Sequence, residues 1–306
     1  MHMIPVFLLT YNEQDFFTTV YSDQFVQQHF VPNKIHFYVL DNGNQPKIQQ
    51  WCEQHGYTYY ASEYNIGSAG AYNWAFKTAH AMGLLTALFM QSDVELSSAW
   101  PLLFTHALTE TFGGTHLPIW PQVFADQENK IPYQTHLLPN LGNLTGFNPR
   151  VLAEKDCYFD ENFVVTHFDD VEFMHYIKVN KKMQALNVTK LLPDSEQFEQ
   201  CATLPGTAKQ SQAFVIKFKN ESIKIHHAAP LLGANEIYSK WYHFNRPYFD
   251  FVFDQCQGQR QPYDSSRWQQ HGYPAYPVLH ELRRFFTIYP DLLVNYEFWK
   301  ISNKAI

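Results

Sequence analysis

The sequence has few cysteines and no long apolar run, and each shortage excludes a class of protein. The four cysteines of the 306-residue chain are widely scattered and form no Cys-x-x-Cys pair. This spacing favours reduced thiols over a disulfide framework or a zinc site. No apolar stretch approaches the roughly 18 residues that a membrane-spanning helix needs. The first residues also lack a basic segment followed by an apolar one, so we expect neither a membrane span nor a signal peptide.

Basic residues are also scarce, with 22 Lys and Arg against 29 Asp and Glu and a formal net charge of −7. Nucleic-acid backbones require concentrated positive charge, so this balance excludes a general nucleic-acid binder. The Gly-x-Gly-x-x-Gly fingerprint of dinucleotide-binding proteins is absent. Aromatic residues are abundant, with 26 Phe, 19 Tyr and 7 Trp, and a chain of this length and composition can bury a large core.

The most informative stretch runs from Leu84 to Leu96, where an apolar run ends abruptly in polar and acidic residues. Its short length predicts a buried strand rather than a helix. In an open α/β sheet, ligands bind beyond the carboxyl ends of the strands, so Asp93 is a candidate for holding a divalent cation and its phosphate. The alternative is that Asp93 caps a helix that begins near Ser97, and the local sequence leaves the two interpretations even.

Strand and helix patterns alternate on both sides of that stretch. We predict strands at residues 4–9, 35–40, 57–61 and 117–124, and helices at residues 46–55 and 98–112. The first two strands end in Thr-Tyr-Asn-Glu (10–13) and Asp-Asn-Gly-Asn (41–44), and the second of these is strong turn chemistry. The β-α-β-α-β order predicts a doubly wound sheet with nucleotide-type ligands at the strand ends.

Two further motifs combine flexible or acidic residues with a helix start. The first contains Asn65, Gly67 and Gly70, whose glycines permit close backbone approach to a ligand or a tight turn; alone, it equally fits an ordinary loop. The second, His-Phe-Asp-Asp-Val-Glu at residues 167–172, precedes an amphipathic helix. Negative charge at a helix N-terminus is favourable for structure alone, but that explanation does not require two adjacent acids in an aromatic setting.

The C-terminal half is less regular. The polar composition of residues 190–222 predicts a loop-rich excursion, a candidate mobile lid. Residues 223–228 predict a short strand that ends in His226 and His227, for which a structural role is the commoner alternative to metal binding. A composition shift follows, and aromatic helices then alternate with a Pro- and Gln-containing loop near residues 257–277.

Taken together and in this order, the motifs resemble those of family 2 glycosyltransferases with the GT-A fold, especially the rhamnosyltransferase-like and galactofuranosyltransferase-like members of bacteria. The resemblance covers roughly residues 4–230; each motif is weak singly, but their order and spacing together are fairly specific. It implies an α/β GT-A domain over residues 1–232, with a Rossmann-like, mostly parallel sheet flanked by helices. A C-terminal helical appendage over residues 233–306 follows, and Tyr242–Arg246 resembles an aromatic-arginine segment common after the catalytic domain.

The resemblance also implies roles for individual residues. The donor, a nucleotide-sugar such as a UDP-sugar, would contact Thr10, Asn12, Asp41, Asn65, Gly67, Asn73 and Ser92. Mn²⁺ or Mg²⁺ would bind Asp93, which resembles the last acid of the family's Asp-x-Asp motif, and His226 or, less favoured, His227. Asp170 resembles the catalytic base, and Asp169, Glu172 and Gly146 would contact or position the acceptor. The sequence departs from the family pattern at Gln91, which replaces the first acid of Asp-x-Asp.

The implied activity is inverting, metal-dependent transfer of a sugar to a glycan or lipid-linked glycan acceptor in bacterial capsule or lipopolysaccharide synthesis. The pattern holds one base and no second nucleophilic carboxylate, which implies direct displacement. The implied location is the cytoplasm, with the inner face of the membrane as an alternative. The aromatic C-terminal third predicts packing against the catalytic domain, against a second copy of the chain as a homodimer, or against the membrane surface; we favour self-association.

Two other functions compete with this one. Because Gln91 weakens the metal motif, the main alternative is a catalytically silent subunit that binds sugar nucleotides within a glycosyltransferase complex. A nucleotidyltransferase shares the α/β plan but is disfavoured, because no glycine-rich loop bearing Arg and Lys follows the first strand. The sequence does not identify the sugar, the base of the donor or the acceptor.

Overall fold

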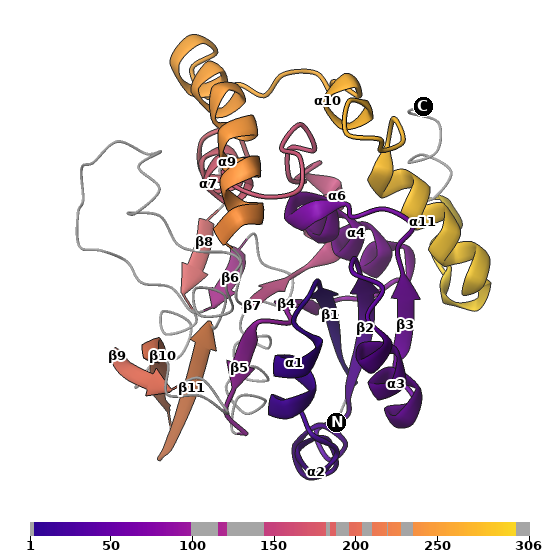
Figure 1. The fold of residues 1–306 in the computed structure, drawn as a ribbon, viewed down its shortest axis with the longest axis vertical. Helices are drawn as coiled ribbons and strands as arrows, with labels where there is room; N and C mark the ends of the chain where they lie inside the picture. Colours follow the sequence, from indigo (N-terminus) through magenta and orange to yellow (C-terminus); the bar gives the residue numbers. More distant parts are fainter. Residues whose placement is uncertain are drawn as a thin grey trace.

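The chain folds around two β-sheets (Figure 1). The computed structural model describes residues 3–98, 116–120, 144–181, 184–187, 196–203, 210–218, 220–227 and 235–297. Within these ranges, one sheet has seven strands and lies between layers of helices, and the other has four strands.

The larger sheet has the strand order β3-β2-β1-β4-β7-β6-β8. Its strands are β1 (Ile4–Thr10), β2 (Ile35–Asp41), β3 (Thr58–Ala61), β4 (Ala87–Gln91), β6 (His116–Trp120), β7 (Leu144–Phe147) and β8 (Gln184–Asn187). The first four in this order are parallel, β7 is antiparallel to both of its neighbours, and β6 and β8 are parallel. The predicted α/β class with a mostly parallel sheet is confirmed.

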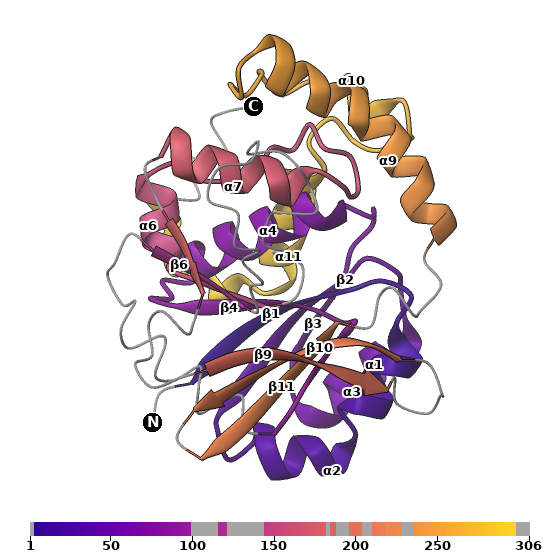
Figure 2. The same ribbon diagram turned by 90° about the vertical axis from the view of Figure 1, so that its left-hand side faces the viewer.

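The apolar strands follow from burial on both faces of this sheet. All seven residues of β1 are buried. Phe7 and Leu9 face one core and Val6 and Leu8 face the other, as the two-residue period of a strand requires. The first core is covered by α4 (Gly67–Ala81), α6 (Pro149–Glu154), α7 (Asp169–Val179) and α11 (Pro277–Ile288); the second is covered by α1 (Gln14–Val20), η1 (Val26–Phe30) and α3 (Pro46–His55) (Figure 2).

The smaller sheet is antiparallel, with the order β5-β11-β10-β9. Its strands are β5 (Val94–Leu96), β9 (Glu196–Thr203), β10 (Gln210–Phe218) and β11 (Glu221–His227). The prediction of a loop-rich excursion over residues 190–222 is therefore wrong in the described part. The signal that polar composition obscured was the apolar run at residues 213–216 within β10, where Ala213 and Val215 are buried.

Strand β5 also corrects the capping interpretation of Asp93. The residue directly precedes a strand that pairs with β11, so no helix begins within the next three residues. The helix expected at residues 98–112 lies outside the described residues, as does the part of the 117–124 strand beyond Trp120.

The C-terminal region is helical, as predicted, and it is built into the main core. It contains α9 (Asn235–Asp250), η4 (Phe251–Gln255), α10 (Ser266–Gln269), α11 and η5 (Pro290–Leu292). Leu282 and Phe285 of α11 are buried in the same cluster as Phe7 and Trp74. A Cβ on Gly70 would lie 3.1 Å from Val278, so α4 and α11 approach closely at this glycine. None of the helices in the described ranges combines the length and apolarity required to cross a membrane.

Candidate active site

Parallel pairing brings the predicted donor segments to one edge of the sheet. Thr10 is opposite Asp41 in the β1–β2 register, and Leu9 is opposite Gln91 in the β1–β4 register. The segments that follow these strands therefore begin side by side, as the sequence predicted. Thr10 is fully buried, whereas Asn12 is exposed and has a left-handed φ of 65°.

Asp41 organises the turn that follows β2. Its Oδ1 accepts hydrogen bonds from Gly43 N at 2.9 Å and Gln45 Nε2 at 3.2 Å. Its Oδ2 accepts from Gln45 N at 2.6 Å and from the Tyr59 hydroxyl at 2.8 Å. A carboxylate offers about four acceptor positions, so this set uses them all. A contact between Asp41 and a nucleotide base stays a prediction, and it requires one of these partners to be exchanged.

The turn after β2 is bonded to the start of α4 through two asparagines. Asn42 Nδ2 donates to Asn65 Oδ1 at 3.1 Å, and the same oxygen accepts the backbone N–H of Gly67 at 2.9 Å. Ser62 Oγ donates to Asn42 Oδ1 at 2.9 Å. The structure thus brings Asn65 and Gly67 next to the Asp41 turn, although they follow different strands.

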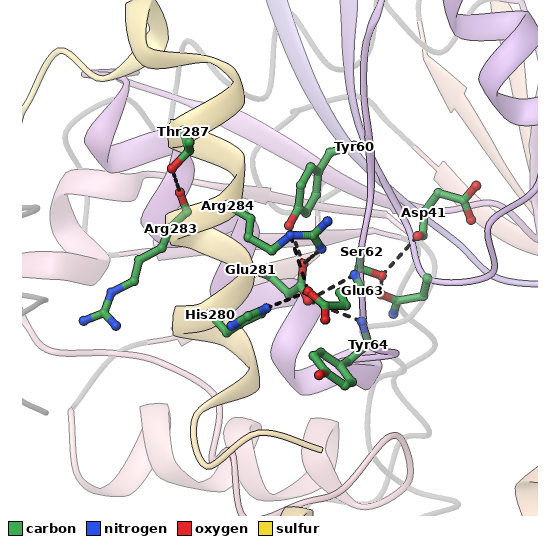
Figure 3. A network of polar contacts seen from close by, with 11 residues as sticks. Asp41, Tyr60, Ser62, Glu63, Tyr64, His280, Glu281, Arg283, Arg284 and Thr287 are labelled. Atoms are coloured by element: carbon green, nitrogen blue, oxygen red, sulfur yellow. Dashed lines mark hydrogen bonds and ion pairs between the residues drawn. The ribbon is translucent and has the colours of Figure 1, made fainter. Parts of the chain in front are cut away.

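A buried acid from α11 fixes the loop that leads into Asn65. Figure 3 shows Glu281 pointing from its helix into this loop. Its Oε1 accepts the backbone N–H groups of Glu63 at 3.1 Å and Tyr64 at 3.3 Å, and its Oε2 accepts from Tyr60 and Arg284. Glu281 was not among the predicted site residues. The available signal was an acid on the apolar face of α11, where the neighbouring positions are buried.

A second carboxylate lies near Asp93, at the tips of β1 and β4. Glu13 Oε2 accepts hydrogen bonds from Ser92 Oγ at 2.8 Å and from Tyr11 N at 2.9 Å. Burial and then the charge of Asp93 raise the pKa of Glu13 to about 7. Glu13 was missed as a site residue, although an acid directly after the first strand was a visible signal.

The two adjacent acids of α7 have different surroundings. Asp169 is buried, and its Oδ2 accepts a hydrogen bond from Ser68 Oγ of α4 at 2.7 Å. Asp170 is half-buried, and its Oδ1 accepts the N–H of Val171 at 2.8 Å. Burial, followed by the charge of Asp170, raises the pKa of Asp169 to about 7, and burial raises the pKa of Asp170. Asp170 is therefore the more accessible carboxylate, and Ser68 is a site residue that the sequence did not single out.

The buried phenol of Tyr72 connects the two groups of acids. Tyr72 lies about one turn after Ser68 on α4, and its hydroxyl is 3.4 Å from Thr145 Oγ1 of β7. Burial is the largest cause that raises the pKa of this phenol, and the charges of Asp169, Asp170 and Asp93 raise it further. The strand-tip acid and the helix acids therefore act electrostatically on the same hydroxyl.

The predicted metal-binding histidine lies in the smaller sheet. His226 is fully buried, and its Nδ1 lies 3.0 Å from Glu95 Oε2. The register places His226 opposite Glu95 rather than Asp93. Within the part of the chain that the structure describes, no group of three or more His, Cys, Asp or Glu side chains is arranged to hold a metal ion. The side chain of His227 lies outside the described residues.

Two other predicted residues support neighbouring segments. Asn73 donates hydrogen bonds to Phe159 O at 3.0 Å and Glu161 Oε1 at 2.8 Å, and it accepts one from Phe159 N at 2.8 Å. It thereby connects α4 to the loop between α6 and α7. Glu172 is buried and accepts two hydrogen bonds from Arg260, at 2.7 and 2.6 Å. Both side chains have partners within the chain, and their predicted ligand contacts stay predictions.

Gly146 lies inside the sheet. It pairs with Leu88, three residues before the carboxyl end of β4 at Gln91. Its predicted role at the acceptor requires a position at that edge, and the register places Gly146 away from it.

Comparisons with known proteins give partial similarities. No protein-family model and no curated protein sequence matches the chain. Residues 1–349 of S. aureus TarS align with 56% of this chain at 17% identity and a TM-score of 0.41, over 54% of that fragment. The same fragment in complex with UDP-GlcNAc aligns with 56% of this chain and 52% of its own length, at 18% identity and a TM-score of 0.40. The mannosyltransferase PcManGT from Pyrobaculum calidifontis, in complex with GDP-Man and Mn²⁺, aligns with 60% of this chain and 54% of its own, at 17% identity and a TM-score of 0.39. The aligned region thus spans about half of each of these solved chains.

Proposed function

We propose that the chain transfers a sugar from a nucleotide-sugar donor to an acceptor hydroxyl. The observation that carries this proposal is the convergence on α4. Ser68 of α4 donates to Asp169 across 101 residues of sequence. One residue earlier, the backbone N–H of Gly67 donates to Asn65 Oδ1, which also accepts from Asn42 in the turn after β2. A donor end and an acceptor end of a transfer site thus adjoin one helix.

The donor is proposed to lie along the carboxyl edge of the parallel strands. Thr10, Asn12, Asn65 and Gly67 border this edge, and the hydrogen bonds among Asn42, Asn65 and Gly67 hold its loops in place before a ligand arrives. Preorganised loops reduce the ordering cost of binding. Ser92 is proposed to support the site through Glu13 rather than to contact the nucleotide directly.

A divalent cation is proposed at Asp93. The donor chemistry fits, because Asp93 and the nearby Glu13 provide carboxylate oxygens, which Mn²⁺ and Mg²⁺ prefer. His226 interacts with Glu95, so the proposal rests on Asp93. When bound, the cation supplies positive charge against the diphosphate that leaves.

Asp170 is proposed as the general base that accepts the proton of the acceptor hydroxyl. It is the more accessible member of the acid pair. Burial raises its pKa, which strengthens its pull on the acceptor proton, while its position in the first turn of α7 acts in the opposite direction and favours the ionised form. Attack assisted by one base gives direct displacement and inversion at the anomeric carbon. We further propose the GT-A family 2 assignment, a glycan or lipid-linked glycan acceptor in capsule or lipopolysaccharide synthesis, and a cytoplasmic location.

A thermal-shift panel of UDP-, GDP- and dTDP-sugars, with and without Mn²⁺, tests the donor proposal. A ligand that binds the folded state raises the melting temperature by mass action, so we expect one nucleotide class to raise it, and more so with Mn²⁺. Asp93→Ala should remove the Mn²⁺-dependent part. No shift with any sugar nucleotide would contradict the proposal. A shift without hydrolysis or transfer would instead favour the silent subunit that Gln91 suggests.

A further inference from the structure

The loop that leads into α7 has an unusual backbone. Val165, His167 and Phe168 have φ values of 63°, 76° and 67°, in the left-handed region. That region is unfavourable for residues with a Cβ, and most unfavourable for a β-branched residue such as Val165. Three such residues within four positions directly precede Asp169. Contacts from elsewhere in the molecule must therefore hold the loop in this conformation.

One set of contacts comes from the start of α4. The carbonyl oxygen of Val165 accepts a hydrogen bond from Ser68 N at 2.6 Å, and Ser68 Oγ, which donates to Asp169, lies 3.2 Å from it. A Cβ on Gly67 would lie 2.2 Å from the same oxygen, so only glycine permits this approach. Ser68 thus binds both the strained loop and Asp169.

The other set comes from a single side chain of α9. Asn245 is fully buried, and its Oδ1 accepts the N–H of Val164 at 3.1 Å. Its Nδ2 donates to Val164 O at 2.8 Å and to Thr166 O at 2.6 Å. Both N–H donors of the amide are therefore used on carbonyls of the loop, and Arg267 Nη2 donates to the same Oδ1 at 3.3 Å.

We propose that Asn245 is a positioning residue that holds the 164–168 loop in its strained conformation. It thereby places Asp169 against Ser68 and Asp170 at the accessible start of α7. Asn245 lies in the aromatic segment Tyr242–Arg246, and no residue of this segment has a role in the proposed transfer reaction. The kinetic part of this inference rests on the proposed glycosyl transfer, and the structural part does not.

The test uses the full chain and two substitutions of the same residue. Asn245→Asp keeps the volume of the side chain but removes both N–H donors, whereas Asn245→Ala also leaves a cavity. We expect both variants to increase amide hydrogen exchange over residues 163–172 by about tenfold or more, with β1 to β3 unchanged. We expect kcat for transfer to fall by about tenfold in both, with donor KM changed by less than about twofold. Asn33→Ala is the matched control, because it removes a 2.8 Å side-chain hydrogen bond to His29 O in a part of the sequence far from the 164–168 loop.

A double-substitution cycle isolates the strain. Glycine tolerates a left-handed φ, so His167→Gly lowers the cost of the loop conformation. The loss of kcat and the gain of exchange caused by Asn245→Ala should therefore be smaller in the His167→Gly background than in the wild type. The proposal would be overturned if Asn245→Ala lost the same fraction of kcat in both backgrounds. It would also be overturned if Asn245→Asp showed wild-type hydrogen exchange over residues 163–172, or if hydrogen exchange increased throughout the chain. If the wild type transfers no sugar, the proposed function fails, and hydrogen exchange still decides the role of Asn245.

Discussion

At the scale of single residues, chemically similar acids have different roles because their surroundings differ. Asp41 and Glu281 use their oxygens to fix loops. Glu172 is paired with Arg260. Asp170 is half-buried at the start of α7, whereas the carboxylate of its neighbour Asp169 accepts a hydrogen bond from Ser68. Accessibility and hydrogen bonding, more than residue type, select the candidate base.

Asp170→Asn preserves the shape of this side chain and removes the base. We expect transfer to fall by about 10²-fold or more, the usual contribution of a general base, while donor and Mn²⁺ binding remain. Steady-state transfer and calorimetric donor titration measure the two effects. Asp291→Asn, an exposed acid of η5, is the control. A wild-type rate in Asp170→Asn would show that the base is another residue.

Asp169 should make the stability of the protein depend on pH. Its folded-state pKa is raised to about 7 by burial and by the charge of Asp170. The folded state therefore keeps its proton in a range where the unfolded chain, with a pKa of about 4, has lost it. The free energy of unfolding should fall as pH rises from about 4 to about 7, and no further above that.

Asp169→Asn should make this dependence less steep, because Asn does not titrate and still accepts the Ser68 bond. The share that comes from Glu13, whose pKa is also raised to about 7, should remain. Urea unfolding at intervals between pH 4.5 and 8 measures it. Parallel curves for the variant and the wild type would mean that Asp169 does not carry the raised pKa.

At the scale of elements, the start of α4 is where the site is assembled. Gly67 lies against the backbone of Val165 and donates its N–H to Asn65, and Ser68 binds that loop and Asp169. The helix therefore joins segments that are about 100 residues apart in sequence. A change in its first turn should disturb the acids of α7 as well as the donor loop.

Gly67→Ala tests this contact, and Gly56→Ala is a matched control. Both glycines have a φ of 69°, but a Cβ at position 56 would have no atom within 4 Å. We expect Gly56→Ala to cost about 1 kcal/mol for the left-handed conformation alone. Gly67→Ala should cost at least about 2 kcal/mol more, because backbone atoms must move. Urea denaturation of both variants measures the difference, and equal costs would contradict the close approach.

At the scale of the whole molecule, the C-terminal helices form part of the main core rather than a separate appendage. Val278, Leu282, Phe285 and Phe286 of α11 are buried against residues of β1 and α4. Asn245, Arg260 and Glu281 reach from this region into loops of the candidate site. The domain boundary near residue 232 stays a prediction, and the packing makes independent folding of the first part unfavourable.

A truncated chain of residues 1–234 should therefore lack a cooperative unfolding transition. It loses the apolar side chains of α11 from the core and leaves the loops around Asn65 and Val165 without their partners. Calorimetry of the full chain should show one transition, and the truncated chain should show none. A cooperative transition near the full-length melting temperature would establish residues 1–234 as an autonomous domain.

Self-association also stays a prediction at this scale. Ile288, Val294 and Tyr296 are exposed apolar side chains near the C-terminal end of the described residues. Their burial between two copies would release ordered water from apolar surface. Light scattering at micromolar concentration measures the mass, and a monomer would remove the dimer from consideration.

The sequence by itself determined the parallel strands β1 to β4 of the larger sheet, and it predicted that ligands bind at their carboxyl ends. Apolar runs of strand length, the turn residues after Thr10 and Asp41, and Pro46 are local signals. They predicted β1, β2 and α3 close to their observed bounds. Parallel pairing then placed the strand tips together, because βαβ connections leave little topological freedom. The strands within residues 190–222 were missed because polar residues dominate that region and the apolar run of β10 is short.

Only the tertiary structure decided which side chains are free to act. The partners of Asn73, Glu172 and His226 lie 86, 88 and 131 residues away in sequence, and these contacts occupy groups that a motif alone would assign to a ligand. Conversely, Glu13, Ser68 and Asn245 acquire their roles through residues 79, 101 and 81 positions away. The hydrogen-bonding capacity of a polar group is finite, so its function depends on which distant atoms folding brings to it, and local sequence does not contain that information.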